Sequence, residues 1–103
     1  MSYKKLVRDK IPDIIKQNEG KDSIIRVLDN DEYLIELNKK IEEELKEYLE
    51  SGEIEELADL EEVLRAILDV KGVSYDDFEK IRQGKVNKRG AFKDKIYLEG
   101  IKD

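Results

Sequence analysis

Four carboxylates at helical spacing are the residues of this chain best placed to do chemistry. Glu44 and Glu47 form one pair and Glu56 and Asp59 a second, with the members of each pair three positions apart. On an α-helix such residues share a face, so each pair would present two carboxylates on one side. Because a hard divalent cation relieves the repulsion between them, the pattern predicts a site for Mg²⁺, with Mn²⁺ as the alternative.

These pairs lie in the most acidic part of the chain. Residues 41–64 hold eleven Asp and Glu residues against one Lys, whereas residues 80–95 hold seven Lys and Arg residues against one Asp. This separation is consistent with an acidic helix that pairs with a basic neighbour. It is equally consistent with an acidic metal site framed by a basic anion site.

Composition excludes several classes of function. The net charge of −6 over 103 residues argues against general binding to nucleic acid polymers or anionic membranes. The chain has no histidine or cysteine, so it cannot build a Ser-His, Cys-His or His-metal centre. It has no apolar run near the roughly 20 residues that a membrane span needs and no apolar signal core, so we expect a cytoplasmic protein.

Apolar periodicity and capping signals predict an all-α fold, a bundle of about four helices in a single domain over residues 1–103. Residues 23–28 form a short β-branched run that could be a strand or an extended connection. The expected helices cover residues 11–19, residues 29 or 30 to about 51, residues 53–70, and residue 75 into the 80s, with Ser74 as the cap of the last.

The second and third helices should form an antiparallel hairpin, since only a few residues around Gly52 join them. The hairpin would bring the two acidic pairs together. Successive rotations of about 100° place Glu56 and Asp59 on the side of their helix that should be buried. An unpaired carboxylate is costly there, so these two acids need a partner.

The third helix also predicts self-association. Its sequence is apolar around most of its circumference, and four short helices in a chain of this size can scarcely cover it. We therefore expect a homodimer or homotetramer, in which a second chain could supply basic groups to the site.

The acidic motif carries a resemblance to a known superfamily. EELKE at residues 43–47 followed by ELAD at residues 56–59 resembles the E-E-x-x-E and E-x-x-D motif of the MazG-like all-alpha nucleoside triphosphate pyrophosphohydrolases, which include phosphoribosyl-ATP pyrophosphohydrolase. KLVRDKIPDII near the start and KVNKRGAFKDKIYLE near the end resemble a small single-domain branch, so nearly the whole chain is covered. Two features depart from the pattern: a gap of only eight residues between the acidic pairs, and Ala91 in place of a second glycine.

The resemblance implies an enzyme that cleaves a nucleoside triphosphate between its α and β phosphates, releasing a monophosphate and pyrophosphate, in a possible house-cleaning role. It implies that Glu44, Glu47, Glu56 and Asp59 hold Mg²⁺. Glu44 and Glu47 are the catalytic candidates, with Glu47 favoured as the base that takes a proton from water. The candidates for holding the substrate's phosphates are Arg8, Lys10, Lys85, Lys88 and Arg89.

Other interpretations stay open. Most acidic residues of a helix are simply solvated, and Lys85, Lys88 and Arg89 could serve only to stabilise a helix C-terminus. The chain could be a non-enzymatic acidic module that binds a basic partner through its helices. It could also be a pyrophosphohydrolase that acts on a phosphoribosyl nucleotide.

Overall fold

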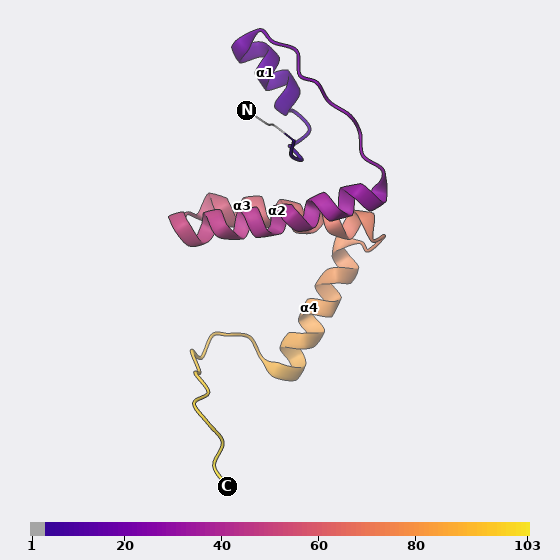
Figure 1. Cartoon of the computed structure of the whole chain (residues 1–103). Coiled ribbons are helices and arrows are strands. Elements are labelled where there is room, and N and C mark those ends of the chain that lie inside the picture. Colours follow the sequence, from indigo (N-terminus) through magenta and orange to yellow (C-terminus); the bar gives the residue numbers. More distant parts are fainter. Residues whose placement is uncertain (1–3) are drawn as a thin grey trace. The chain divides into compact units, whose positions relative to one another are not determined.

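A computed structural model describes residues 4–103, and within them the chain forms four α-helices and no β-strand (Figure 1). The predicted all-α fold is therefore confirmed. The helices are α1 (Ile11–Glu19), α2 (Asn30–Ser51), α3 (Ile54–Val70) and α4 (Tyr75–Arg89).

The chain divides into two compact units, residues 1–72 and residues 73–103. The first unit holds α1, α2 and α3, and the second holds α4 and the segment that follows it. The expectation of a single domain stays a prediction.

The ends of the helices follow from the sequence. The side chain of Asp29 accepts a hydrogen bond from the backbone N–H of Glu32 at 2.9 Å and caps α2. In the second unit, Ser74 does the same for α4 by accepting from the N–H of Asp77 at 3.1 Å. These short polar side chains satisfy backbone donors that have no partner inside the helix. The predicted cap at Ser74 is confirmed, and of the two expected starts of α2, residues 29 and 30, Asp29 is the cap.

Residues 20–29 form an extended connection without strand pairing. Ile24 and Val27 are fully or almost fully exposed, so the β-branched residues of this segment gain no burial. The guanidinium of Arg26 donates two hydrogen bonds to the carboxylate of Glu32, which ties the connection to the first turn of α2. Of the two interpretations of this run, the extended connection is therefore the correct one.

Helices α2 and α3 pack against each other as a hairpin and lie side by side (Figure 1). Gly52 ends α2 with φ of +70°, and its N–H donates to the carbonyl of Tyr48 at 2.7 Å. Glycine adopts this left-handed conformation without steric cost, so the chain can reverse within two residues before α3 begins. The connection is too short for any arrangement other than antiparallel.

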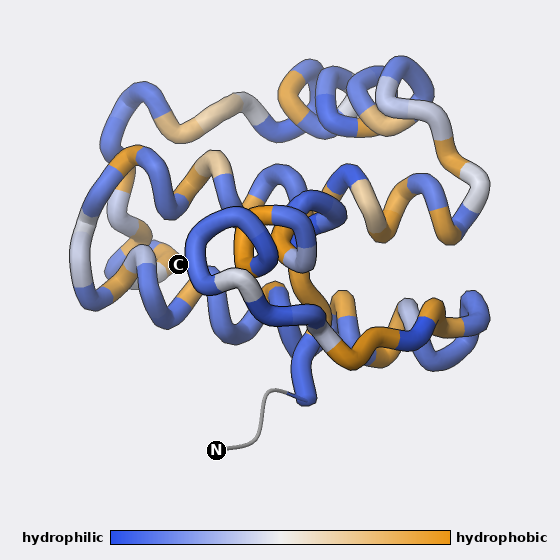
Figure 2. Tube along the Cα trace, turned by 90° about the horizontal axis from the view of Figure 1, so that it is seen from above, coloured by the Kyte–Doolittle hydropathy of each residue, from blue (hydrophilic) through white to orange (hydrophobic). Residues whose placement is uncertain are grey.

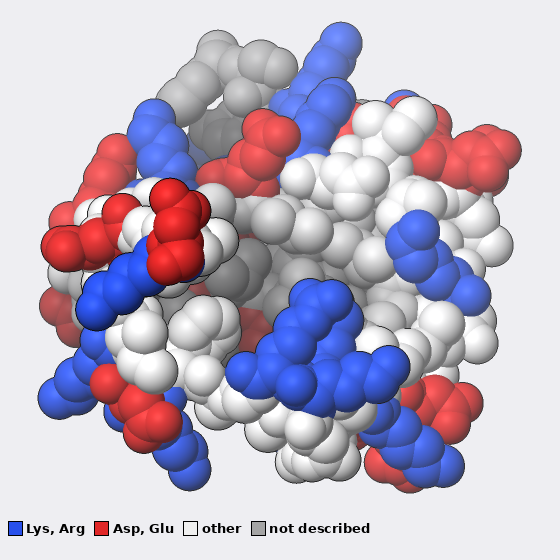
Figure 3. Space-filling view, turned by 90° about the horizontal axis from the view of Figure 1, so that it is seen from below, with Lys and Arg blue, Asp and Glu red and all other residues white. Residues whose placement is uncertain are grey.

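The core of the hairpin is small. Among the described residues, Leu37 of α2 and Ile67 of α3 are the buried apolar side chains, with 3% and 9% exposure. Apolar residues recur along the helices between hydrophilic runs (Figure 2), and charged side chains of both signs cover much of the face in Figure 3. Much apolar surface, including Leu49 and Ile54, therefore remains exposed at the turn of the hairpin.

Because the core is so small, its stability should depend heavily on Leu37. We expect Leu37→Ala to lower the free energy of unfolding by about 2–4 kcal/mol, since it removes buried contacts and leaves a cavity. Ile24→Ala, at a fully exposed position, should change it by no more than about 0.5 kcal/mol. Urea unfolding at one fixed protein concentration measures both. Equal effects of the two substitutions would contradict the assignment of Leu37 to the core.

Candidate metal centre

Three carboxylates of the hairpin converge on one point. Glu44 projects from α2, and Glu56 and Asp59 project from α3, one turn apart. Each offers an oxygen atom, and these three atoms all lie within 4.8 Å of one another. All three residues are half-buried, so the antiparallel packing that forms the core also forces the acidic groups together.

Glu47 lies one turn further along α2 and is exposed. It does not belong to the group of three oxygens within 4.8 Å, but its charge acts on two members of that group and raises the pKa of both Glu44 and Glu56. The structure therefore places all four predicted acids in one neighbourhood. Glu44, Glu56 and Asp59 form its tight part, and Glu47 stands at its edge.

Glu44 is the most deeply placed carboxylate of the four. Its side chain is 13% exposed, and its Oε2 atom is buried without a hydrogen-bond partner among the described residues. Burial, followed by the neighbouring Glu47 carboxylate and the charge of Asp59, raises the pKa of Glu44 to about 7. The Lys40 ammonium, 4.0 Å from the other Glu44 oxygen, acts in the opposite direction.

The same forces act on Glu56. Partial burial first, and then the charges of Glu47 and Asp59, raise the pKa of Glu56 above its ordinary value. Close carboxylates in a partly desolvated position thus destabilise one another. A buried oxygen without a partner, beside two further carboxylate oxygens, is a donor set that suits a hard cation such as Mg²⁺.

A positive group from the segment before α1 also contacts the cluster. A terminal nitrogen of Arg8 donates to Oδ1 of Asp59 at 2.6 Å, joining the segment before α1 to α3. Arg8 is 60% exposed and Asp59 40% exposed, so solvent screens this pair. Sequence reasoning assigned Arg8 to the substrate's phosphates, whereas in the structure its partner is one of the candidate metal ligands.

The other predicted phosphate ligands are exposed side chains. Lys10 is exposed at the N-cap of α1, in the first unit. Lys85, Lys88 and Arg89 are exposed on α4 in the second unit, and the last two stand in its final turn, where positive charge is favourable. Within residues 4–103, no hydrogen bond or ion pair fixes any of these four side chains.

Sequence reasoning did not select Lys40 as a functional residue. Its ammonium lies 3.3 Å from Glu43 and 4.0 Å from Glu44, and its side chain is only 18% exposed. The spacing of i+3 and i+4 on one helix was the available signal for these contacts. That spacing is common on solvated helices, so it does not single out a lysine beside a site.

Comparisons with family models, with curated proteins and with solved structures found no match for this chain. In the part of the chain that the structure describes, no helix is long and apolar enough to cross a membrane. The functional interpretation therefore rests on the acidic cluster and on the motifs of the sequence.

The raised pKa of Glu44 predicts how stability depends on pH when no metal is present. In the unfolded chain this carboxyl titrates near 4.5 and in the folded chain near 7, so its ionisation increasingly opposes folding as the pH rises through that window. We expect Glu44→Gln in chelator to increase the free energy of unfolding at pH 8 by about 1 kcal/mol or more, after discounting for solvent screening. This gain should shrink as the pH falls toward 4.5.

Urea unfolding at pH 5 and pH 8 checks this expectation. Glu50→Gln serves as the control, because Glu50 is exposed on the same helix and outside the cluster. A gain for Glu44→Gln that is the same at both pH values, or that matches the control, would show that ionisation of Glu44 does not oppose folding.

Proposed function

We propose that this protein is an Mg²⁺-dependent nucleoside triphosphate pyrophosphohydrolase that resembles the MazG-like superfamily and acts in nucleotide house-cleaning in the cytoplasm. The observation that supports this most directly is the convergence of Glu44, Glu56 and Asp59, with one buried oxygen of Glu44 left without a partner. Carboxylates that were only a solvated helical surface would not require burial of such an oxygen.

In this proposal Glu44, Glu56 and Asp59 hold the metal, and Glu47 is left for proton transfer. The exposed position of Glu47, at the edge of the cluster, suits a carboxylate that must meet water and substrate. When bound, Mg²⁺ would neutralise charge on the phosphates and lower the pKa of the attacking water.

The hydrolysis needs no nucleophile from the protein. The oxygen of water attacks the α phosphorus and forms a P–O bond, and a proton of that water passes to a carboxylate oxygen of Glu47. The bond from the α phosphorus to the bridging oxygen breaks, so that the monophosphate forms and pyrophosphate leaves with the bridging oxygen. Arg8 lies at the cluster on the side of Asp59, so its guanidinium is placed to pair with a phosphate group next to the metal ligands. Lys10, Lys85, Lys88 and Arg89 are the further phosphate ligands of the proposal.

The main test is release of pyrophosphate from a panel of ordinary and modified nucleoside triphosphates and a phosphoribosyl nucleotide, with Mg²⁺, with Mn²⁺ and with chelator. We expect metal-dependent turnover that Glu56→Gln lowers by more than about a hundredfold, because even partners outside the ligand shell commonly contribute 10- to 100-fold. Glu62→Gln removes the same charge from an exposed position of α3 outside the cluster and should leave turnover unchanged.

Two outcomes would contradict the proposal. Turnover that persists in chelator, or that Glu56→Gln leaves intact, would exclude the cluster as the metal site. No turnover on any substrate, combined with no Mg²⁺ binding in calorimetry, would favour the non-enzymatic interaction module.

We also propose that the protein forms a homodimer or homotetramer. Leu49 and Ile54, on either side of the hairpin turn, are 71% and 74% exposed, and Ile35 on α2 is 56% exposed. Burial of large aliphatic side chains is favourable, and these side chains stay in water in a single chain. A second copy of the chain could bury them.

Sedimentation velocity at micromolar concentration should therefore show a dimer or larger species. Leu49→Asp should shift it toward monomer, because it places a charge in the surface that we expect to be covered. Val27→Asp is the control, since Val27 is 93% exposed but belongs to the extended connection. A monomer in the unmodified protein would exclude self-association, and equal shifts in both variants would exclude the hairpin as the interface.

A further inference from the structure

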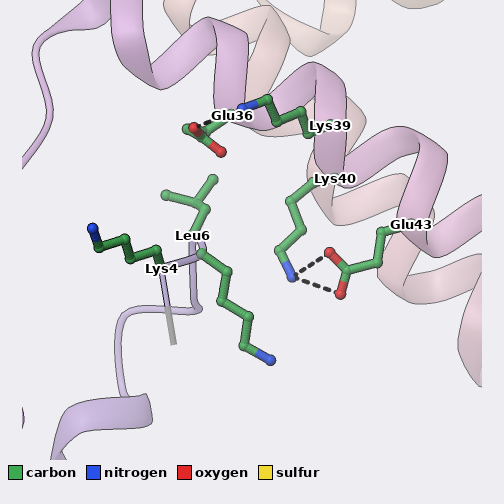
Figure 4. A pocket seen from close by; sticks show the side chains of 7 residues that line it. Lys4, Leu6, Glu36, Lys39, Lys40 and Glu43 are labelled. Atoms are coloured by element: carbon green, nitrogen blue, oxygen red, sulfur yellow. Dashed lines mark hydrogen bonds and ion pairs between the residues drawn. The ribbon is translucent and has the colours of Figure 1, made fainter. Parts of the chain in front are cut away.

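The first unit contains a cavity between the segment before α1 and the middle of α2, and the proposed function does not yet use it. Its volume is about 220 Å³. Figure 4 shows Leu6 pointing from the amino-terminal segment toward α2, and Lys40 reaching from α2 to the carboxylate of Glu43. The residues that line the cavity are Lys4, Lys5, Leu6, Glu36, Lys39, Lys40 and Glu43.

The lining carries an excess of positive charge. On α2, the Lys39 ammonium lies 3.2 Å from Glu36, and the Lys40 ammonium lies 3.3 Å from Glu43, so each of these lysines has a carboxylate nearby. Among the described residues, Lys4 and Lys5 have no ion-pair partner. The four lysines and two glutamates of the lining therefore leave two positive charges without a counterion.

Three of the four lysines that line this cavity, Lys4, Lys5 and Lys39, are exposed, so solvent screens the repulsion between them. Lys4 and Lys5 are more than thirty residues away from Lys39 and Lys40 in the sequence, so the fold rather than chain proximity gathers them. The half-buried Leu6 anchors the segment that carries the first two. An anion with two negative charges would neutralise the excess, and ammonium groups are common ligands of phosphate.

The size of the cavity restricts the ligand further. Pockets that bury most of a drug-sized molecule usually measure about 300–1,000 Å³, and this cavity is smaller. It has room for one or two phosphate groups. The base and sugar of a nucleotide bound in this way would lie outside it.

Lys40 connects the cavity to the acidic cluster. Its ammonium lines the cavity and lies 4.0 Å from the carboxylate of Glu44, the most deeply placed member of the cluster. A phosphate group in the cavity would therefore be a neighbour of phosphate groups held at Glu44, Glu56 and Asp59. In a triphosphate chain, the β and γ phosphates are neighbours of the α phosphate in the same way.

We propose that this cavity binds the pyrophosphate end of a nucleoside triphosphate, the β and γ phosphates, through Lys4, Lys5 and Lys40. This assignment rests on the proposed function and adds a substrate subsite to it. After hydrolysis the same subsite holds the product pyrophosphate, with Lys40 between the product and the carboxylates.

The test uses inorganic pyrophosphate as the probe and the full chain in chelator, so that neither metal nor turnover is needed. Titration calorimetry should detect binding by the unmodified protein, and Lys4→Gln with Lys5→Gln should weaken it about tenfold, as expected for the loss of two solvent-screened ionic contacts. The matched control is Lys21→Gln with Lys71→Gln, which removes the same charge from exposed positions of the same unit outside the cavity. The control should bind pyrophosphate as the unmodified protein does.

Binding that is absent, or equally strong in the two double variants, would overturn the phosphate site. Such a failure differs from a failure of the proposed function, which would appear as missing turnover while pyrophosphate binding persists.

A second measurement distinguishes substrate from free anion. If the cavity holds the substrate's phosphates, Lys4→Gln with Lys5→Gln raises KM for the triphosphate by a similar factor and pyrophosphate inhibits competitively. Weakened pyrophosphate binding with unchanged KM would overturn the assignment to substrate and leave a site for free phosphate or pyrophosphate.

Discussion

The packing of α2 against α3 is the constraint on which the candidate site depends. The reversal at Gly52 fixes the two helices as antiparallel neighbours, and burial of Leu37 and Ile67 holds them together. Because the acidic pairs lie on either side of that reversal, the same packing that buries the apolar side chains forces Glu44 toward Asp59. The favourable burial and the unfavourable repulsion are thus coupled, and burial in a small core must outweigh the repulsion between the carboxylates.

The geometry of this hairpin could be predicted from the sequence because its determinants are local. The cap Asp29, the glycine stop at Gly52 and the i+3 spacing of the acids each act over a few residues. The structure also separates the two acids of α2: the side chain of Glu44 is 13% exposed, whereas Glu47 is an exposed residue.

The contacts of the amino-terminal segment could not be predicted in this way. Arg8 pairs with Asp59 across fifty-one positions, and residues 4–6 line a cavity against α2, but the segment has no periodicity that fixes its path. For an irregular segment, which side chain meets which carboxylate depends on tertiary packing and not on spacing. Sequence reasoning therefore identified Arg8 as a candidate for the substrate's phosphates, but it did not predict the contact of Arg8 with Asp59 or the residues that line the cavity.

These two parts of the first unit have opposite charge, and that difference links them. The hairpin concentrates carboxylates that need a counterion, and the segment before α1 carries cations: Arg8 contacts Asp59, and Lys4 and Lys5 line the cavity together with Lys40, which lies 4.0 Å from Glu44. A divalent cation at the cluster would draw on the same Asp59 carboxylate as Arg8, whose guanidinium contacts Oδ1. In the proposed enzyme the metal weakens the pair of Arg8 with Asp59, and the guanidinium can then pair with a phosphate of the substrate. The metal and the phosphates would then favour each other's binding. The metal takes the place of Arg8 at Asp59, and the phosphate takes the place of Asp59 at Arg8.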